Sequence, residues 1–264
     1  MDSLRRLAEI VSALRSPEGC PWDRAQTLDS LRPFLLEECY EVLEALDRQD
    51  YRALAAELGD LLLQVFLEAQ VASESGLFDL EEVAARIADK LERRHPHVFA
   101  GAEARTPEEV LCLWRGVKLQ ESAESAAPQS RLDGIPRALP ALQRAQKVQG
   151  RAAAVGFDWQ SAEGALTQLE SEAAELRRAQ QEREPGRLAD ELGDVLFSVV
   201  NVARFLGVDA EAGLRQACRK FEARFRRAEQ LAQEAGRTLE ALSAEELDRL
   251  WQQAKQEEAR AGET

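Results

Sequence analysis

Two acidic patterns recur in this sequence at a spacing that suits metal binding. Glu38 and Glu41 stand three residues apart, as do Glu57 and Asp60. The same four residue types return 134 positions later, as Glu172, Glu175, Glu191 and Asp194. Residues three apart share one face of a helix, so each pair directs two carboxylates the same way. The second pair of each set lies in an apolar run, where an uncompensated charge costs several kcal/mol. The pattern predicts a bound cation.

The identity of this cation follows from the donor atoms. Carboxylate-only sites suit hard ions, so we expect Mg²⁺, with Mn²⁺ as a substitute. Ion pairing along the helix is a poor alternative, because five acids and no base stand between Leu35 and Asp47. A ferritin-like di-iron site requires Glu-x-x-His pairs. The only histidines, His95 and His97, flank Pro96, and we expect them in a loop that ends a helix.

Basic and aromatic residues at one-turn spacing accompany the acids in both halves of the chain. The pairs are Lys90 with Arg94, Lys220 with Arg224, Trp114 with Lys118, and Trp251 with Lys255. Lysine and arginine contact phosphates, and an indole ring offers a stacking surface. Each pair taken alone also fits an ordinary helix surface or a core tryptophan. Their recurrence beside the acids predicts a phosphate-containing ligand.

Composition favours an all-α protein. Alanine, leucine, glutamate, arginine and glutamine dominate the 264 residues, and β-branched and aromatic residues are sparse. A net charge of −14 argues against nucleic acid as the main partner. The sequence shows no apolar stretch typical of a membrane span or a signal peptide, so we expect no membrane association and a cytoplasmic location. The four cysteines lack CxxC spacing and are expected as small core residues.

The repeat at an offset of 134 predicts a duplicated helical module. A stretch rich in proline, glycine, serine and alanine separates the copies, which gives an N-terminal module at 1–120, a linker at 121–136 and a C-terminal module at 137–264. Gly76 and Pro96 are expected to stop helices. Amphipathic periodicity predicts helices near 3–15, 28–48, 51–75, 79–94, 138–155, 161–181, 186–206, 209–235 and 244–262.

Three stretches resemble the MazG family of bacterial nucleoside triphosphate pyrophosphohydrolases, an all-α family. They are "LLEECYEVLEAL" with "LAAELGDLLLQVF", then "DKLERRHPHVF", and "RAQKVQGRAAAVGFDW". The resemblance covers essentially the whole chain. It implies Mg²⁺-dependent hydrolysis of a nucleoside triphosphate to the monophosphate and pyrophosphate. It also implies tandem helical-bundle modules that intertwine in a homodimer, with the C-terminal module as the main catalytic one.

The resemblance assigns roles to individual residues. Metal ligands fall on Glu172, Glu175, Glu191 and Asp194, which would also be catalytic, and on their counterparts Glu38, Glu41, Glu57 and Asp60. Nucleotide contacts fall on Lys118, Arg187, Lys220, Arg224, Trp251 and Lys255. The sequence departs from the family at Ser171, where a glutamate is usual, and at Gln168, where a basic residue is usual.

The expected mechanism is direct attack by a metal-activated water, with a carboxylate as proton acceptor. No cysteine, serine or histidine is placed for covalent catalysis. A narrower hydrolase for a deoxynucleoside triphosphate or phosphoribosyl-ATP stays open, as does a non-catalytic nucleotide-binding scaffold. A regulatory protein partner is also left open, because no segment identifies one.

Overall fold

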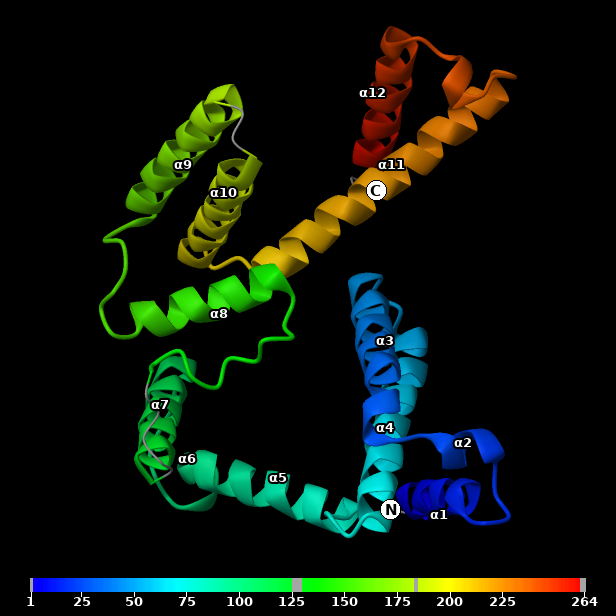
Figure 1. The fold of residues 1–264 in the computed structure, drawn as a ribbon, viewed down its shortest axis with the longest axis vertical. Helices are drawn as coiled ribbons and strands as arrows, with labels where there is room; N and C mark the ends of the chain where they lie inside the picture. The colour runs from blue at the N-terminus through cyan, green and yellow to red at the C-terminus, as the bar shows by residue number, and fades with distance from the viewer. Residues whose placement is uncertain (1, 125–129, 183–184, 262–264) are drawn as a thin grey trace. The chain divides into compact units, whose positions relative to one another are not determined.

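The computed structural model describes residues 2–124, 130–182 and 185–261, and these residues contain helices and no strand. The all-α prediction is therefore confirmed. Figure 1 shows the helices in chain order. Those of the first half are α1 (Asp2–Arg15), α2 (Pro21–Ala25), α3 (Leu28–Asp47), α4 (Tyr51–Glu74), α5 (Leu80–Arg94), α6 (Pro96–Phe99) and α7 (Pro107–Glu124). Those of the second half are α8 (Ala141–Ala153), α9 (Ala162–Glu182), α10 (Pro185–Phe205), α11 (Ala210–Glu234), a 3₁₀ turn at Leu239–Ala241 and α12 (Ala244–Ala261).

The chain divides into two compact units, Met1–Ala127 and Pro128–Thr264. The helices that carry the acids form a close antiparallel pair in each unit, α3 with α4 in the first and α9 with α10 in the second (Figure 1). Helix α7 continues to Glu124, so the first four residues of the linker predicted at 121–136 are helical. Residues 125–129 of that linker lie outside the described part of the chain.

A short connection positions α3 against α4. The N-cap of α3 is Thr27, whose hydroxyl accepts a hydrogen bond from the Ser30 backbone N–H, and Ser30 in turn accepts one from the Thr27 N–H. Asp50 caps α4 in the same way, with its carboxylate accepting from the N–H groups two and three residues ahead. Gln49, between the helices, takes a left-handed φ of 56°. Two fixed helix starts and a tight turn therefore hold the pair in register.

The core of the first unit lies where α1 and α3 meet the C-terminal half of α4. Val11 from α1 and Leu31 from α3 are each 1% exposed and pack with Phe66, Leu67 and Val71 of α4. The apolar residues of the ELGDLLLQVF run thus supply the core, while the glutamate and aspartate at its start lie beyond it. Burial of this half of α4 fixes the orientation of the acidic half.

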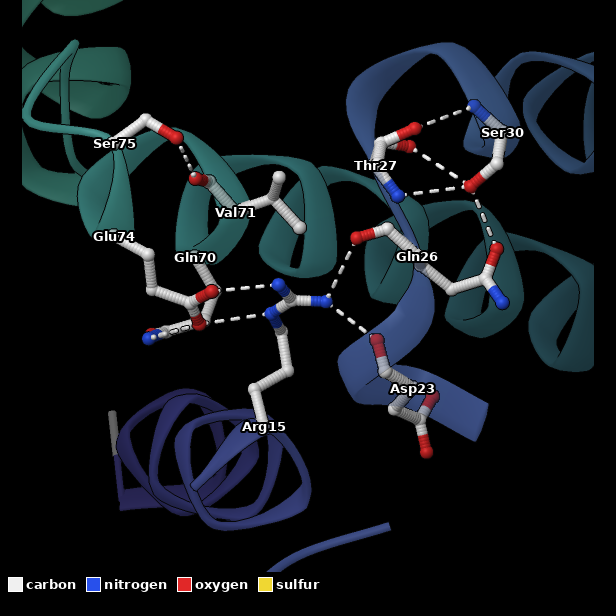
Figure 2. Close-up of polar contacts among 9 residues, drawn as sticks. All are labelled: Arg15, Asp23, Gln26, Thr27, Ser30, Gln70, Val71, Glu74 and Ser75. Atoms are coloured by element: carbon white, nitrogen blue, oxygen red, sulfur yellow. Dashed lines mark hydrogen bonds and ion pairs between the residues drawn. The ribbon is translucent and has the colours of Figure 1, made fainter. Parts of the chain in front are cut away.

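Arg15 joins three segments of the first unit. Its side chain is 6% exposed and forms a two-pronged ion pair with Glu74 at the end of α4, at 2.8 and 2.6 Å. The same guanidinium donates to the backbone carbonyls of Asp23 and Gln26 at the end of α2 (Figure 2). This contact raises the pKa of Arg15 and lowers that of Glu74, because each stabilises the charge of the other.

The second unit contains two helix pairs. Helix α10 packs on α9 and α8, and α11 packs on α12 (Figure 1). Ion pairs join the latter pair, with Arg224 Nε 2.5 Å from Glu258 and Arg227 Nε 2.6 Å from Glu257. Small residues fill the contacts: Ala165, Ala179 and Val200 between α9 and α10 are no more than 1% exposed.

The cysteines depart from the prediction of a core role. Cys20 and Cys39 are half-buried, but Cys112 and Cys218 are exposed, and none of the four is paired. The prediction was wrong for the latter two, because they lie on outward-facing positions of α7 and α11.

Within the described ranges, no helix combines the length and low charge that crossing a bilayer requires.

Candidate functional site

A cluster of three glutamates lies on the facing surfaces of α3 and α4. Glu38 and Glu41, one turn apart on α3, meet Glu57 of α4, and one carboxylate oxygen from each lies within 4.8 Å of the others. We call these three residues the first cluster. The predicted convergence of an ExxE and an ExxD pair onto one place is thus seen for three of its four acids.

The charges of the first cluster are not balanced within the described chain. Arg48, the first base after Glu38 and Glu41 along the chain, pairs with Glu44 instead. None of the three glutamates forms an ion pair with a residue that the structure describes. Partial burial raises the pKa of the Glu38 carboxyl above its ordinary value, and the charge of Asp60 raises it further. Desolvation and then the charge of Glu57 raise the pKa of Glu41.

The second cluster repeats this arrangement on α9 and α10. Glu172 and Glu175 of α9 meet Glu191 of α10, again with one oxygen from each within 4.8 Å of the others. Glu191 is 9% exposed and is the most deeply placed of the three. The duplication seen in the sequence is therefore also present in the structure, as two similar clusters of three glutamates.

Each glutamate of the second cluster has a hydrogen-bond donor from its own chain. The Gln168 amide donates to Glu172 at 2.6 Å, one helical turn away. Arg187 Nε lies 3.2 Å from Glu191, and Arg187 also contacts Glu182. Arg178 lies 3.8 Å from Glu175, which the Ser171 hydroxyl also approaches, at 3.5 Å. The second cluster is thus partly neutralised, whereas the first is not.

Both predicted aspartate ligands lie outside the clusters. Asp60 and Asp194 are exposed and follow Glu57 and Glu191 by one turn. An aspartate carboxylate lies one methylene closer to its helix than a glutamate carboxylate, so it reaches less far across the gap. The charge of Asp60 nevertheless acts on Glu38, so this residue borders the first cluster.

The predicted nucleotide contacts of the second unit lie on another helix pair. Lys220 and Arg224 are on α11, Trp251 and Lys255 on α12, and the Phe221 ring is 5.1 Å from the Trp251 ring. No hydrogen bond or ion pair joins these residues to the second cluster in the described part of the chain. Arg187 is the predicted contact that the structure brings to the acids. Lys118 lies in α7, but its side chain lies outside the described part.

In the first unit, the corresponding basic and aromatic residues gather near the end of α5. Lys90 is exposed and Arg94 half-buried, and the His95 ring meets the Trp114 ring edge-on at 5.3 Å between centroids. His95 Nδ1 is 2.7 Å from the Leu91 carbonyl. His95 thus lies at the end of α5, as expected, whereas His97 lies within the short helix α6, where a loop was expected. Neither histidine belongs to the two carboxylate clusters.

The donor chemistry of both clusters fits a hard divalent cation. All the converging atoms are carboxylate oxygens on two rigid helices, and in the first cluster the repulsion between them is relieved by protons or by a cation. Gln64 of α4 is buried, and its amide oxygen lacks a hydrogen-bond partner in the described residues. Three carboxylates per cluster also leave room for phosphate oxygens, as is usual for Mg²⁺.

Comparison with known proteins finds a family match in the segments that contain the two clusters. The family model "MazG nucleotide pyrophosphohydrolase domain" matches twice, at residues 26–99 and 160–229. The chain belongs to this family. A nucleoside triphosphate pyrophosphohydrolase of Escherichia coli K12 is 46% identical over 98% of this chain and 99% of its own. A "nucleoside triphosphate pyrophosphohydrolase/pyrophosphatase MazG" of Thermotoga maritima is 45% identical over 94% of each chain. The crystal structure of a mazG-related protein from the same organism is 33% identical, covers 44% of this chain and 98% of its own, and has a TM-score of 0.39.

The two MazG matches contain the two clusters. The first match spans α3 to α6, and the second spans α9, α10 and most of α11 with Lys220 and Arg224. The polar neighbours of the acids are less visible in the sequence. Gln64 and Arg178 were not predicted as site residues, although Gln64 lies seven residues after Glu57 and so shares its helix face.

Proposed function

We propose that this chain hydrolyses nucleoside triphosphates to the nucleoside monophosphate and pyrophosphate, with Mg²⁺ as cofactor and Mn²⁺ as a substitute. The observation that carries the proposal is the MazG family match, which falls on both carboxylate clusters. The near-full-length relative from E. coli bears the name of this activity. A carboxylate cluster that holds a hard cation suits a polyphosphate substrate, because the substrate supplies further oxygen ligands.

The acids of the second unit would hold the cation. We assign this role to Glu172, Glu175 and Glu191, with Asp194 at the border. Bound Mg²⁺ would offset the phosphate charge and activate a water for in-line attack. A carboxylate oxygen not engaged by the cation would accept the proton of that water. The Gln168 amide, 2.6 Å from Glu172, restricts the rotation of that side chain and so keeps one carboxylate oxygen pointed into the cluster.

The basic residues would bind the phosphates. Arg187 lies beside Glu191 and presents a planar fork of N–H groups that matches phosphate oxygens. We assign further phosphate contacts to Lys118, Lys220, Arg224 and Lys255. Trp251, stacked near Phe221, would offer its ring to the base. These groups would stabilise the charge that develops on the departing pyrophosphate.

A homodimer is part of the proposal. Within the described chain, the second cluster and the cations of α11 and α12 lie on separate helix pairs, and no hydrogen bond or ion pair joins them. Leu192, Leu196 and Val199 form an outward stripe on α10 and are 49, 48 and 43% exposed. A second copy that covers this stripe would bury apolar surface next to the second cluster. We also place the protein in the cytoplasm, in keeping with four unpaired cysteines.

The test is a product assay with purified full-length protein. A panel of ribo- and deoxyribonucleoside triphosphates is incubated with Mg²⁺, and products are separated by anion-exchange chromatography. Pyrophosphate and the monophosphate are expected in equal amounts. EDTA should stop the reaction, and Mg²⁺ or Mn²⁺ should restore it. Orthophosphate with the diphosphate as the main products would overturn the proposal, and binding without any turnover would favour a nucleotide-binding scaffold.

A further inference from the structure

Two arginines one helical turn apart on α11 join this helix to α12. Arg224 Nε lies 2.5 Å from a carboxylate oxygen of Glu258, and these side chains are 26% and 39% exposed. Arg227 Nε lies 2.6 Å from Glu257, and these side chains are 33% and 36% exposed. By distance and exposure alone, the two ion pairs are equivalent links between the two helices.

The two arginines differ in what their terminal nitrogens contact. Arg227 uses Nη1 as well as Nε, because Nη1 lies 3.0 Å from Glu234 and 3.5 Å from the amide oxygen of Gln230. Arg224 is held through Nε alone. No hydrogen bond or ion pair joins its Nη1 or Nη2 to a residue that the structure describes. The chain therefore occupies both ends of the Arg227 guanidinium but leaves the outer end of Arg224 open to a ligand.

The outer end of an arginine is suited to phosphate. Its two Nη groups form a planar fork that matches the spacing of phosphate oxygens. An acid that accepts a hydrogen bond from Nε leaves this fork exposed and fixes the plane in which it lies. Because an arginine side chain has many rotamers, fixing that plane before the ligand arrives lowers the entropic cost of binding. The contact of Glu258 with Arg224 Nε is of this kind.

The residues beside this ion pair are cations of the proposed nucleotide site. Lys220 precedes Arg224 by one turn of α11, and Lys255 precedes Glu258 by three residues on α12. Both lysines are exposed, and neither forms an ion pair with a residue in the described part of the chain. Glu258 is thus an acid among cations that we assign to phosphate. Its negative charge alone would repel that ligand, so its presence there requires a role that outweighs the repulsion.

We propose that Glu258 positions Arg224, holding Nε so that Nη1 and Nη2 face the phosphates of the nucleotide. The proposal rests on the proposed function, because it takes Arg224 as a phosphate contact. Glu258 acts through Arg224 and touches no substrate. Glu257 has no such role, because its partner Arg227 is also held by Glu234.

The experiment measures the affinity of the full-length protein for α,β-methylene ATP with Mg²⁺ by isothermal titration calorimetry. This analogue keeps the triphosphate, but a methylene replaces the bridging oxygen at the bond whose hydrolysis gives pyrophosphate. Glu258→Leu removes one negative charge together with the acceptor of Arg224 Nε. The loss of charge alone would tighten binding of the analogue, whereas the loss of positioning should weaken it about 3- to 10-fold. Glu258→Gln, whose amide oxygen can still accept from Nε, should recover most of the affinity.

The matched control is Glu257→Leu, which removes the same charge from the neighbouring ion pair between the same two helices. It should bind the analogue as tightly as the wild type, or up to about twofold more tightly. Thermal unfolding followed by circular dichroism should show similar losses of stability for the two leucine variants. A second control uses an Arg224→Gln parent, which should itself bind the analogue more weakly. Glu258→Leu should have no further effect in that parent.

Four outcomes would overturn the proposal. They are unchanged or tighter binding by Glu258→Leu, an equal loss of affinity in Glu257→Leu, an undiminished loss in the Arg224→Gln parent, and wild-type affinity in that parent or no binding by the wild type. None of these measurements involves turnover. The product assay on the unmutated protein therefore tests the proposed function separately, and release of pyrophosphate there would stand whatever the calorimetry shows.

Discussion

Glu38 and Glu41 hold protons more tightly in the folded protein than in the unfolded chain, because partial desolvation and neighbouring acids raise both pKa values above 4.5. Well below pH 4.5, the ordinary pKa of a glutamate, both carboxyls are protonated in the folded and in the unfolded protein, so they do not repel each other. As the pH rises through the raised values, ionisation destabilises the folded state. The contribution of this pair to the free energy of unfolding therefore falls as the pH rises above about 4.5.

This loss of stability with rising pH can be measured by comparing the wild type with a variant that cannot ionise. In EDTA, urea unfolding of the wild type should lose stability from pH 5 to pH 8 relative to the double variant Glu38→Gln, Glu41→Gln, which cannot ionise there. Saturating Mg²⁺ should shrink the difference, because a cation replaces the protons. Parallel pH profiles for the two proteins in EDTA would contradict the assigned pKa directions.

The acids of the site could be predicted from the sequence, but their partners could not. An ExxE pair followed by an ExxD pair is a pattern of residue types at helical spacing, and helix geometry alone places three of each set together. The contacts of Gln168, Arg178 and Arg187 with the second cluster depend on side-chain conformations, which the sequence does not give. Asp60 and Asp194 share the correct face, yet the gap between helices decides whether the shorter side chain reaches.

At the scale of elements, Arg15 is expected to matter more than other charged residues of α1. It is buried, pairs with Glu74 and satisfies two carbonyls at the end of α2. Arg15→Met keeps an unbranched side chain but leaves these acceptors without their donor. We expect a loss of about 2 kcal/mol in the free energy of unfolding of the first unit, measured by urea titration.

The control is Arg86, whose ion pair with Glu82 is exposed and lies within one helix. Arg86→Met should cost no more than about 0.5 kcal/mol. Equal losses for the two variants would show that the contact in Figure 2 is no stronger than a surface ion pair.

Helix positions could largely be predicted from periodicity and stop signals. The predicted helices near 28–48, 51–75 and 186–206 correspond to Leu28–Asp47, Tyr51–Glu74 and Pro185–Phe205. Gly76 takes a left-handed φ of 66° just after α4, as a helix-stopping glycine should. The short helices α2 and α6 were not predicted, because a single turn carries too few residues for a periodic signal.

At the scale of the whole molecule, the exposed stripe of Leu192, Leu196 and Val199 favours assembly into a dimer. Three aliphatic residues on one helix face, each more than two-fifths exposed, favour a covering surface. Light scattering at micromolar concentration should therefore give at least twice the chain mass of 29.4 kDa. Leu196→Asp with Val199→Asp should shift the protein toward the monomer. A wild-type monomer would contradict the dimer.

The duplication could be predicted from a constant offset of 134 positions, and the two MazG matches confirm it. The unequal environment of the two copies could not be predicted in full. Ser171, Gln168 and Arg187 were visible as differences from the first copy, but their contacts with Glu175, Glu172 and Glu191 depend on side-chain geometry. Equal motifs therefore do not imply equal chemistry.

The second unit is expected to carry most of the turnover. Arg187 beside Glu191 adds a phosphate-binding group that Ala53 does not supply in the first unit. The opposing observation is Ser171, which replaces the glutamate that the first unit keeps as Glu37. A hydroxyl 3.5 Å from Glu175 still supports that ligand, so we expect the arginine to outweigh the lost carboxylate.

Paired variants decide between the units. Glu172→Gln with Glu191→Gln keeps the shape of the second cluster but removes two negative ligands, and Glu38→Gln with Glu57→Gln does the same in the first. Metal stabilisation is worth several kcal/mol, so the second-unit variant should lose pyrophosphate release about 100-fold or more. The first-unit variant should keep most of its turnover. The reverse outcome, a dead first-unit variant and an active second-unit variant, would place the chemistry between α3 and α4.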